Sequence, residues 1–360
     1  MKTAFTDLFG VQYPILNAGM GRIALPKMVA AVSNAGGLGM LGAGSNPPEL
    51  TRQLVREIRA LTDRPFGANT PLALPNGKEN AKVLLDEQVP VINYSMGRGD
   101  WITERAHAYG GKTIASVTTV HLAQRAEAHG ADAVIAAGHE AAGHSGDVTT
   151  MVLVARLVEL LKIPVIAAGG IANGSGLLAV LALGASAASM GTRFWTTQEG
   201  PMHQNFKDLA LASDIEGTVY SNRFDGIANR MMRSPAVDQM AKKIGIPLAS
   251  FFQSFGIARE LNIPYLKLVR DVVSDGPKAT IDMMRMARML KGNTIALTTG
   301  EVGKGMAASG MSVGLVHDLP SVSELIARIV AEAEASFSHL ETTFLGRSLP
   351  TGDCVLELAG

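Results

Sequence analysis

The stretch PVIAAGGIANGSGLLAVLALGASAASMGTRF, from Pro164 to Phe194, is the part of the chain that decides its fold. Two short apolar runs, 164–168 and 185–190, are each followed at once by a turn rich in glycine or small polar residues. The segment between the two runs is apolar and is interrupted at Gly184. This arrangement is typical of two parallel strands joined by a helical crossover.

Six more short apolar runs precede this stretch, at 14–18, 37–41, 65–69, 89–94, 112–116 and 132–136. Between them lie segments whose apolar residues recur at helical spacing, among them 48–61, 121–129 and 152–161. Eight strands alternating with helices are the number that closes a barrel, so the sequence predicts an α/β fold of the (β/α)8 TIM-barrel type. An open doubly wound sheet is the rival, but no early turn carries a convincing dinucleotide-binding fingerprint.

The alternation stops after the eighth strand. Residues 201–310 predict a mostly helical insertion with methionine-rich stretches, such as 281–290. A last helix at 321–335 would then complete the barrel wall. We therefore assign 1–200 and 311–340 to the barrel and 201–310 to an insertion at its C-terminal rim. A substrate lid, a packing appendage and a dimer contact all remain open as roles for the insertion.

The composition is that of a globular protein with a sizeable core, because 47% of the 360 residues are hydrophobic and 18% are charged. Basic and acidic residues are equal in number, so the formal net charge is zero. Without a block of basic residues, we expect neither nucleic acid nor a membrane as a partner. We expect a small-molecule substrate, and a homodimer stays open.

Cys354 is the only cysteine, so no internal disulfide forms, and this fits a reducing compartment. Asp7 interrupts the apolar core that a signal peptide would need at the N-terminus. The longest apolar stretch, at about 177–190, is too short to span a bilayer. We therefore expect a cytoplasmic protein.

Two turns of the deciding stretch suit a bound phosphate. AGGIANG (168–174) begins at the end of the seventh run, and SMGTRF (189–194) begins at the end of the eighth. Backbone N–H groups hold a phosphate dianion well, and glycine lets that backbone approach closely. The loops after strands seven and eight are also where barrels of this type bind phosphates. A ligand that carries a phosphate is therefore expected here.

A third segment, AAGHEAAGHSG (136–146), supplies the candidate catalytic residue. A zinc site is rejected, because His139 and His144 are five residues apart in a glycine-rich stretch, whereas the helical HExxH motif needs four. Small residues flank His144, it follows a barrel strand, and imidazole suits proton transfer near neutral pH. We take His139 as structural, and His107, His121 and His129 as solvated helix residues. No metal is expected.

With these segments in view, the chain resembles the nitronate monooxygenase (2-nitropropane dioxygenase) family, which also contains FMN-dependent enoyl-acyl-carrier-protein reductases. The resemblance extends from about residue 5 to about residue 335. It rests on YPI (13–15) with Gly19 and Met20, NAGGLG (34–39), TDRPFGAN (62–69), EAAGH (140–144) and both phosphate turns.

The resemblance implies FMN as the cofactor and His144 as the catalytic base. It places Gly19, Met20 and Asn69 around the flavin and its ribityl chain, and it assigns the phosphate end to Gly169, Gly170, Ser189, Met190, Gly191 and Thr192. Three positions depart from the family pattern. Ala142 stands where the family motif has a glycine, and Ala137 stands where many members carry a flavin-contacting glutamine. Met311 stands where a glutamine is common. Flavin binding is still expected at Ala137 and Ala142, with altered hydrogen bonding.

The first functional hypothesis is an FMN-dependent oxidoreductase of the nitronate monooxygenase type, which oxidises alkyl nitronates with oxygen. The alternative is an NAD(P)H-dependent FMN reductase that acts on an enoyl thioester or a quinone. A non-catalytic flavin-binding protein is the third. Arg270, Arg285, Arg288 and Lys291 are candidates for nucleotide phosphates, although charges along a helix are more often a solvated face.

Overall fold

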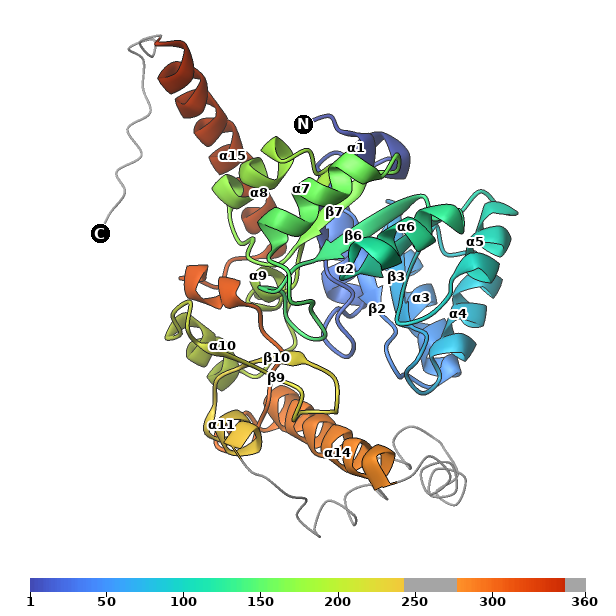
Figure 1. The fold of residues 1–360 in the computed structure, drawn as a ribbon, viewed down its shortest axis with the longest axis vertical. Helices are drawn as coiled ribbons and strands as arrows, with labels where there is room; N and C mark the ends of the chain where they lie inside the picture. Colours follow the sequence, from blue (N-terminus) through green and yellow to red (C-terminus); the bar gives the residue numbers. More distant parts are fainter. Residues whose placement is uncertain (243–276, 347–360) are drawn as a thin grey trace.

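The computed structural model describes residues 1–242 and 277–346, without the side chains of 277–284. Eight parallel strands form a barrel with helices around it (Figure 1), so the predicted TIM-barrel class is confirmed. The strands are β1 (Ile15–Asn17), β2 (Gly39–Gly42), β3 (Phe66–Pro71), β4 (Val91–Ser95), β5 (Lys112–Val117), β6 (Ala133–Ala137), β7 (Val165–Ala168) and β8 (Ala187–Met190). Each overlaps its predicted run, and no end differs by more than two residues.

The barrel closes between β1 and β2, where the strands share only a single bridge, Leu16 to Leu38. A buried side chain completes this seam. The Asn17 amide donates to the carbonyl of Met40 and accepts from its N–H, both at 2.8 Å. Asn17 thus provides partners for the backbone N–H and carbonyl of Met40 at the seam. A hydrophobic side chain at position 17 would leave both groups unsatisfied.

Helices cover the outside of the barrel in the expected order: α2 (Pro26–Asn34), α3 (Pro48–Leu61), α4 (Gly77–Asp86), α5 (Asp100–His107), α6 (Val120–Ala128), α7 (Thr150–Leu160) and α8 (Gly174–Ala182). The eighth position belongs to α15 (Val322–Leu345), which packs against α8 and α2. Ser321 and Glu324 form a capping box that fixes its start. It ends ten residues later than predicted, and its second half projects away from the barrel (Figure 1).

The interior of the barrel is a packed apolar core. Its lower layers are filled by side chains from the strands, including Leu16, Ile114 and Ile166. The short helix α1 (Ala4–Phe9) adds Phe5 and Phe9 to this cluster and so plugs the end where the strands begin. In barrels of this type, ligands bind at the opposite end, where the strands finish.

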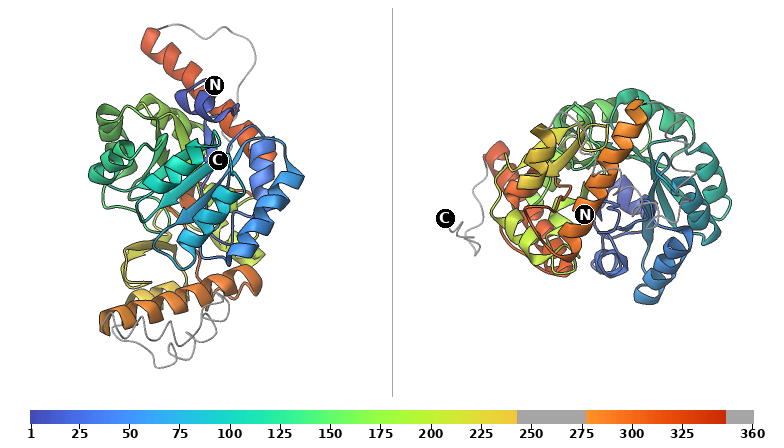
Figure 2. Two further views of the ribbon diagram at one scale, coloured as in Figure 1. Left: turned by 90° about the vertical axis from the view of Figure 1, so that its right-hand side faces the viewer. Right: turned by 90° about the horizontal axis from the view of Figure 1, so that it is seen from below.

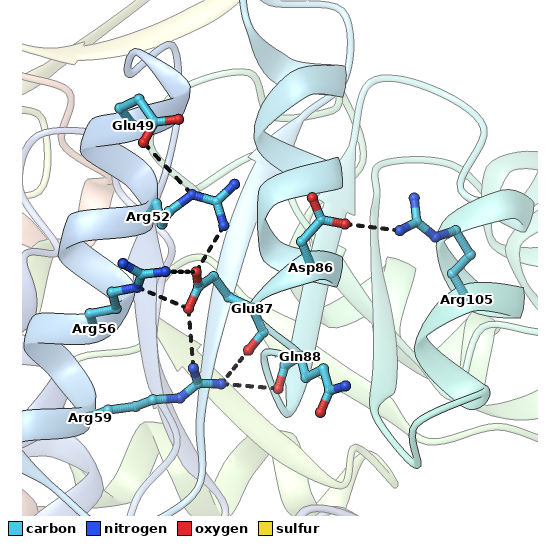
Figure 3. Close-up of polar contacts among 8 residues, drawn as sticks. All are labelled: Glu49, Arg52, Arg56, Arg59, Asp86, Glu87, Gln88 and Arg105. Carbon is cyan, nitrogen blue, oxygen red and sulfur yellow. Dashed lines mark hydrogen bonds and ion pairs between the residues drawn. The ribbon is translucent and has the colours of Figure 1, made fainter.

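An arginine cluster joins α3 to the end of α4, on the side where the strands begin (Figure 3). Arg52, Arg56 and Arg59 converge on the carboxylate of Glu87 at 2.8, 2.9 and 3.3 Å. Arg59 also donates to the backbone carbonyl of Glu87, which caps α4. Hydrogen bonding from Arg56 is the leading cause that lowers the pKa of Glu87.

The region after β8 contains helices, as predicted, but also a β-ribbon that the sequence analysis missed. The short α9 (Thr192–Trp195) comes first, and then α10 (Gln204–Leu211), α11 (Pro235–Lys242), α14 (Pro277–Thr298) and the 3-10 turn η1 (Met311–Leu315). The antiparallel ribbon of β9 (Thr218–Ser221) and β10 (Asn229–Met232) lies between α10 and α11. The ribbon escaped notice because its strands have only four residues each and show no clear apolar alternation.

The insertion lies beyond the ends of the strands, with α14 crossing the end of the molecule opposite the projecting part of α15 (Figures 1 and 2). Among the described residues, no helix is long and apolar enough to cross a membrane. Some residues singled out in the sequence lie outside the described part of the chain. These are Arg270 and Cys354, together with the side chains of residues 281–284 in the methionine-rich stretch.

Candidate functional site

The strand register brings most of the predicted site residues to one face of the barrel. Ala137 is level with Ala168 on β7, and Ala168 is level with Ser189 on β8. Met190 is in turn level with Asn17 on β1. The turns after β6, β7, β8 and β1 therefore lie side by side at the carboxyl ends of four neighbouring strands. Asn69 reaches the same face from β3.

Across the barrel from these turns, three polar side chains on β3, β4 and β5 form a hydrogen-bonded network. This network is the floor of the candidate site. Asn93 on β4 donates to the carbonyl of Ile114 at 3.0 Å, which fixes its amide orientation. Its Oδ1 then accepts from Asn69 at 2.6 Å and from Ser116 on β5 at 3.2 Å. Asn69 must therefore direct its NH2 sideways and keep its own Oδ1 as an acceptor for a ligand.

Sequence reasoning missed Asn93 and Ser116. The available signal is their alternation with apolar residues, because Val91 lies two positions before Asn93, and Ile114 two positions before Ser116. Val91 and Ile114 belong to the interior cluster, so Asn93 and Ser116 point inward one layer higher. An inward polar residue at the end of a barrel strand indicates a ligand site rather than a core position.

The turn after β7 provides a backbone cradle. Gly169 and Gly170 have φ values of +112° and +76°, which side chains rarely adopt. A Cβ at Gly169 would also lie 2.8 Å from the backbone nitrogen of Ala141. Within residues 1–242 and 277–346, the N–H of Gly170 donates to no backbone carbonyl. An exposed N–H of this kind suits a phosphate oxygen.

The turn after β8 adjoins this cradle. The N–H of Gly191 likewise has no backbone acceptor in the described part of the chain. Thr192 is less available than predicted, because its Oγ1 already accepts from the N–H of Gly310 at 2.9 Å. The side chain of Met190 packs in the core between strands and helices, so only its backbone reaches this face.

The turn after β1 packs closely on the floor. A Cβ at Gly19 would lie 2.2 Å from Cβ of Asn69, so only glycine permits this approach. Met20 follows and contacts the cluster that contains Trp195 of α9 and Phe206 of the insertion. Arg22, two residues further on, donates to Thr294 of α14 at 2.9 Å. The insertion is thus attached to the β1 turn as well as to the β8 turn.

His144 lies in the turn after β6, where Gly143 has a φ of +68°. The histidine side chain is 27% exposed, so the predicted accessibility of the ring is present. Its Nε2 lies 2.7 Å from Oδ2 of Asp225, a carboxylate that is only 2% exposed. Asp225 belongs to the loop between β9 and β10, and sequence reasoning did not single it out. The two residues are 81 positions apart, and no local motif joins them.

The β9–β10 ribbon clamps the turn that carries His144. Gly143 and Arg230 exchange backbone hydrogen bonds at 3.2 and 2.9 Å. The buried Arg230 guanidinium donates twice to the carbonyl of His139, at 3.1 and 3.0 Å, and it lies 5.1 Å from the ring centre of Tyr220. Tyr220 donates its hydroxyl to the carbonyl of Ser145 at 2.8 Å. Burial lowers the pKa of Arg230.

The other histidines have separate partners. The ring of His139 lies 3.1 Å from the carbonyl of Gly146 and packs edge-on against Tyr220, an arrangement that fits a structural role. His107 is not simply solvated as expected, because its Nε2 lies 2.8 Å from Asp132. This pair joins the end of α5 to the residue before β6.

The departures from the family pattern are accommodated by the local backbone. Ala142 is not among the residues with positive φ, so its Cβ causes no left-handed strain. Ala137 ends β6 at the inner face. Met311 donates its N–H to the carbonyl of Glu140 at 3.0 Å, which joins the end of the insertion to the histidine turn.

Of the basic residues considered for nucleotide phosphates, Arg288 on α14 donates to the side chain of Gln239 at 3.1 Å.

Comparisons with known proteins find relatives that match almost the whole chain. The family model described as nitronate monooxygenase matches residues 2–84 and 73–332. A (3aS,4S,5R,7aS)-5-hydroxy-7a-methyl-1-oxo-octahydro-1H-indene-4-carboxyl-CoA dehydrogenase from Rhodococcus jostii (strain RHA1) is 32% identical, over 92% of this chain and 96% of that protein. A nitronate monooxygenase from Paraburkholderia phytofirmans is 29% identical, over 94% and 97%. The structure of FabK from Thermotoga maritima superposes with a TM-score of 0.80 at 33% identity, over 95% and 99%.

Proposed function

Because the chain belongs to the nitronate monooxygenase family, we propose that it is an FMN-dependent oxidoreductase in which His144 removes a proton from carbon. The proposed substrate class is a nitroalkane or its nitronate. The observation that carries the proposal is the position of His144, accessible and held by a buried carboxylate, beside two glycine turns at the carboxyl ends of the strands.

Three features of the chain fit FMN. In the described part of the chain the N–H groups of Gly170 and Gly191 have no backbone acceptor and suit its terminal phosphate, and the small residue Ala137 leaves room for a flat ring. The fixed Oδ1 of Asn69 suits an N–H or hydroxyl donor. When bound, FMN supplies the acceptor for the two electrons that leave the substrate carbon, and oxygen takes them from there.

The residues of the chain have distinct tasks in this proposal. With a neutral nitroalkane, His144 accepts the acidic proton next to the nitro group, and that electron pair stays on the substrate as the nitronate. With a preformed nitronate, no proton has to leave carbon, and His144 serves only to orient the anion. The ribbon residues Arg230 and Tyr220 hold the turn that carries His144 in place.

A second candidate function is the dehydrogenation or reduction of a coenzyme A thioester. The Rhodococcus jostii relative, a carboxyl-CoA dehydrogenase by name, favours it, because it matches almost the whole chain. The chemistry is related, since a thioester also acidifies the neighbouring C–H bond and a base in the position of His144 would serve both reactions. NADH or NADPH would be the partner in the reductive direction.

Anaerobic mixing separates these candidates. Purified protein loaded with FMN is mixed in turn with nitroethane, ethylnitronate, a saturated acyl-CoA, NADH and NADPH, and the flavin absorbance is followed. Rapid bleaching by the two nitro compounds supports the first function, and bleaching by the acyl-CoA or a nicotinamide supports the second. A flavin that none of them bleaches would contradict both and leave a non-catalytic binding protein.

A further inference from the structure

Two groups that can only donate a hydrogen bond, a backbone N–H and an amide NH2, face the buried carboxylate of Asp225. Its Oδ1 accepts from the N–H of Ile227 at 3.2 Å. Its Oδ2 accepts from Nδ2 of Asn229 at 3.2 Å and lies 2.7 Å from Nε2 of His144. Each oxygen thus accepts from a group that can only donate, an arrangement that favours the ionised carboxylate.

The orientation of the Asn229 amide also favours an ionised Asp225, although it leaves an Asn229 atom without a hydrogen-bond partner among the described residues. Its amide is buried, and its Oδ1 has no hydrogen-bond partner among the described residues. Turning the amide over would place that oxygen against Asp225 and remove a donor from the carboxylate. The observed orientation leaves an acceptor unsatisfied in order to direct an NH2 group at Asp225, so the donors here are arranged around a negative charge.

A carboxylate that only accepts requires His144 to donate through Nε2. The neutral ring then carries its proton on Nε2 and its lone pair on Nδ1. Among the described residues, no group hydrogen-bonds to Nδ1 of His144. The lone pair is therefore left for a substrate.

We infer that Asp225 is a positioning residue that fixes the Nε2–H tautomer of His144, so that Nδ1 is the atom that takes the proton from the substrate carbon. This inference rests on the proposed function. In the step, the C–H bond breaks, its electron pair stays on the substrate, and a new N–H bond forms at Nδ1. The ring becomes an imidazolium whose positive charge lies against Asp225, and it returns the proton to solvent after the product leaves.

The inference gives the insertion a direct part in the chemistry. Asp225 comes from the loop of the β9–β10 ribbon, and the bridge between Gly143 and Arg230 sets the distance between that loop and the histidine turn. The barrel alone supplies the base. The ribbon supplies the group that determines which of its nitrogen atoms is basic.

The first test uses the tautomer itself and needs no substrate. Protein labelled with 15N-histidine is studied by long-range proton–nitrogen NMR at alkaline pH, with His144→Gln to assign the signal. The inference predicts a protonated Nε2 and a bare Nδ1 in the wild-type protein, and loss of this single state in Asp225→Asn. A wild-type ring protonated on Nδ1 would overturn it.

The second test uses catalysis with two substrates. Asp225→Asn keeps the shape of the side chain but lets the amide donate or accept, so the tautomer is no longer fixed. We expect kcat with nitroethane to fall by at least about tenfold, as a share of general-base catalysis, while kcat with ethylnitronate, KM and bound FMN change little. Asp238→Asn is the matched control, because Asp238 is a half-exposed carboxylate of the same insertion that pairs with Arg233.

Equal losses of kcat on nitroethane and ethylnitronate would show a merely structural role for Asp225 and overturn the inference. The two tests also separate its failure from that of the proposed function. If the wild-type protein turns over neither nitro compound, the proposed function fails, and the NMR result alone decides the role of Asp225.

Discussion

Two neighbouring regions of the barrel face differ in what they present. After β7 and β8 the chain offers backbone N–H groups, held open by Gly169, Gly170 and Gly191. After β6 it offers the His144 side chain, which the insertion holds with a second side chain, Asp225. The first region is suited to binding a cofactor, and the second to moving a proton. Affinity and rate should therefore respond to different substitutions.

The two regions also differ in how far apart their parts lie in the sequence. Each glycine turn is a continuous stretch and directly follows its own strand. The histidine turn is completed by residues about 80 positions later, and its shape depends on the ribbon that carries them. The predictions below use this contrast, from the largest expected effect to the smallest.

Arg230→Met should have the largest effect, because it removes the clamp on the histidine turn. The substitution removes both Arg230 donors from the carbonyl of His139, which keeps only the Ser145 hydroxyl at 3.3 Å, and it removes the Arg230 donor from the buried hydroxyl of Thr218. We expect the free energy of unfolding to fall by about 2–4 kcal/mol and turnover to fall with it. Urea denaturation and steady-state kinetics measure the two quantities.

Arg233→Met is the matched control for this change. Arg233 follows the same strand, but its side chain is 53% exposed and pairs with Asp238 at the surface. Its loss should cost about 1 kcal/mol or less and leave turnover unchanged. If both arginine variants lost the same stability, the ribbon would not be the anchor that we describe.

Gly170→Ala should weaken FMN binding without slowing the loaded protein. Alanine at a φ of +76° is strained by roughly 1–2 kcal/mol, and the free protein can relieve this strain by shifting the turn. Binding must then restore the strained turn, so we expect the FMN dissociation constant to rise about tenfold. Turnover at saturating FMN should stay close to that of the wild type. Fluorescence titration with FMN gives the affinity.

Gly303→Ala is the corresponding control, because Gly303 has no positive φ and a Cβ there would meet nothing within 4 Å. It should bind FMN as the wild type does. A Gly170→Ala variant with normal affinity and reduced turnover would reverse the division of labour between the two regions.

Glu87→Gln should have the smallest effect, because Glu87 lies between the end of α4 and the start of β4, at the end of the barrel opposite the candidate site. Arginine contacts lower the pKa of Glu87 in the folded protein, so its ionised form stabilises the fold at neutral pH. This contribution, about 1 kcal/mol, should disappear as the pH falls through the lowered pKa. Thermal unfolding of both proteins from pH 7 to pH 3 should show two stabilities that converge, with unchanged activity at pH 7.

The sequence was sufficient for the barrel and for the glycine turns because each depends on local patterns. Strand runs, helical spacing and glycines adjacent in the chain all appear within a few residues of one another. The β9–β10 ribbon, Asp225 and Arg230 escaped because their roles come from pairing with the turn after β6. Nothing near Asp225 in the sequence says that a histidine will lie 2.7 Å away. The contact from Gly310 to Thr192 escaped for the same reason, since Gly310 comes from the end of the insertion.

The contrast between the two regions is tested most directly by His144→Ala with two substrates. The variant should retain FMN, because the glycine turns are untouched, and flavin absorbance of the purified protein measures this. With nitroethane, its turnover should fall roughly 100- to 10,000-fold, and with ethylnitronate by less than about tenfold, because only the neutral compound still has a proton to lose. Equal losses on the two substrates, or a variant without FMN, would contradict the account, because His144 would then hold the fold or the cofactor rather than move a proton.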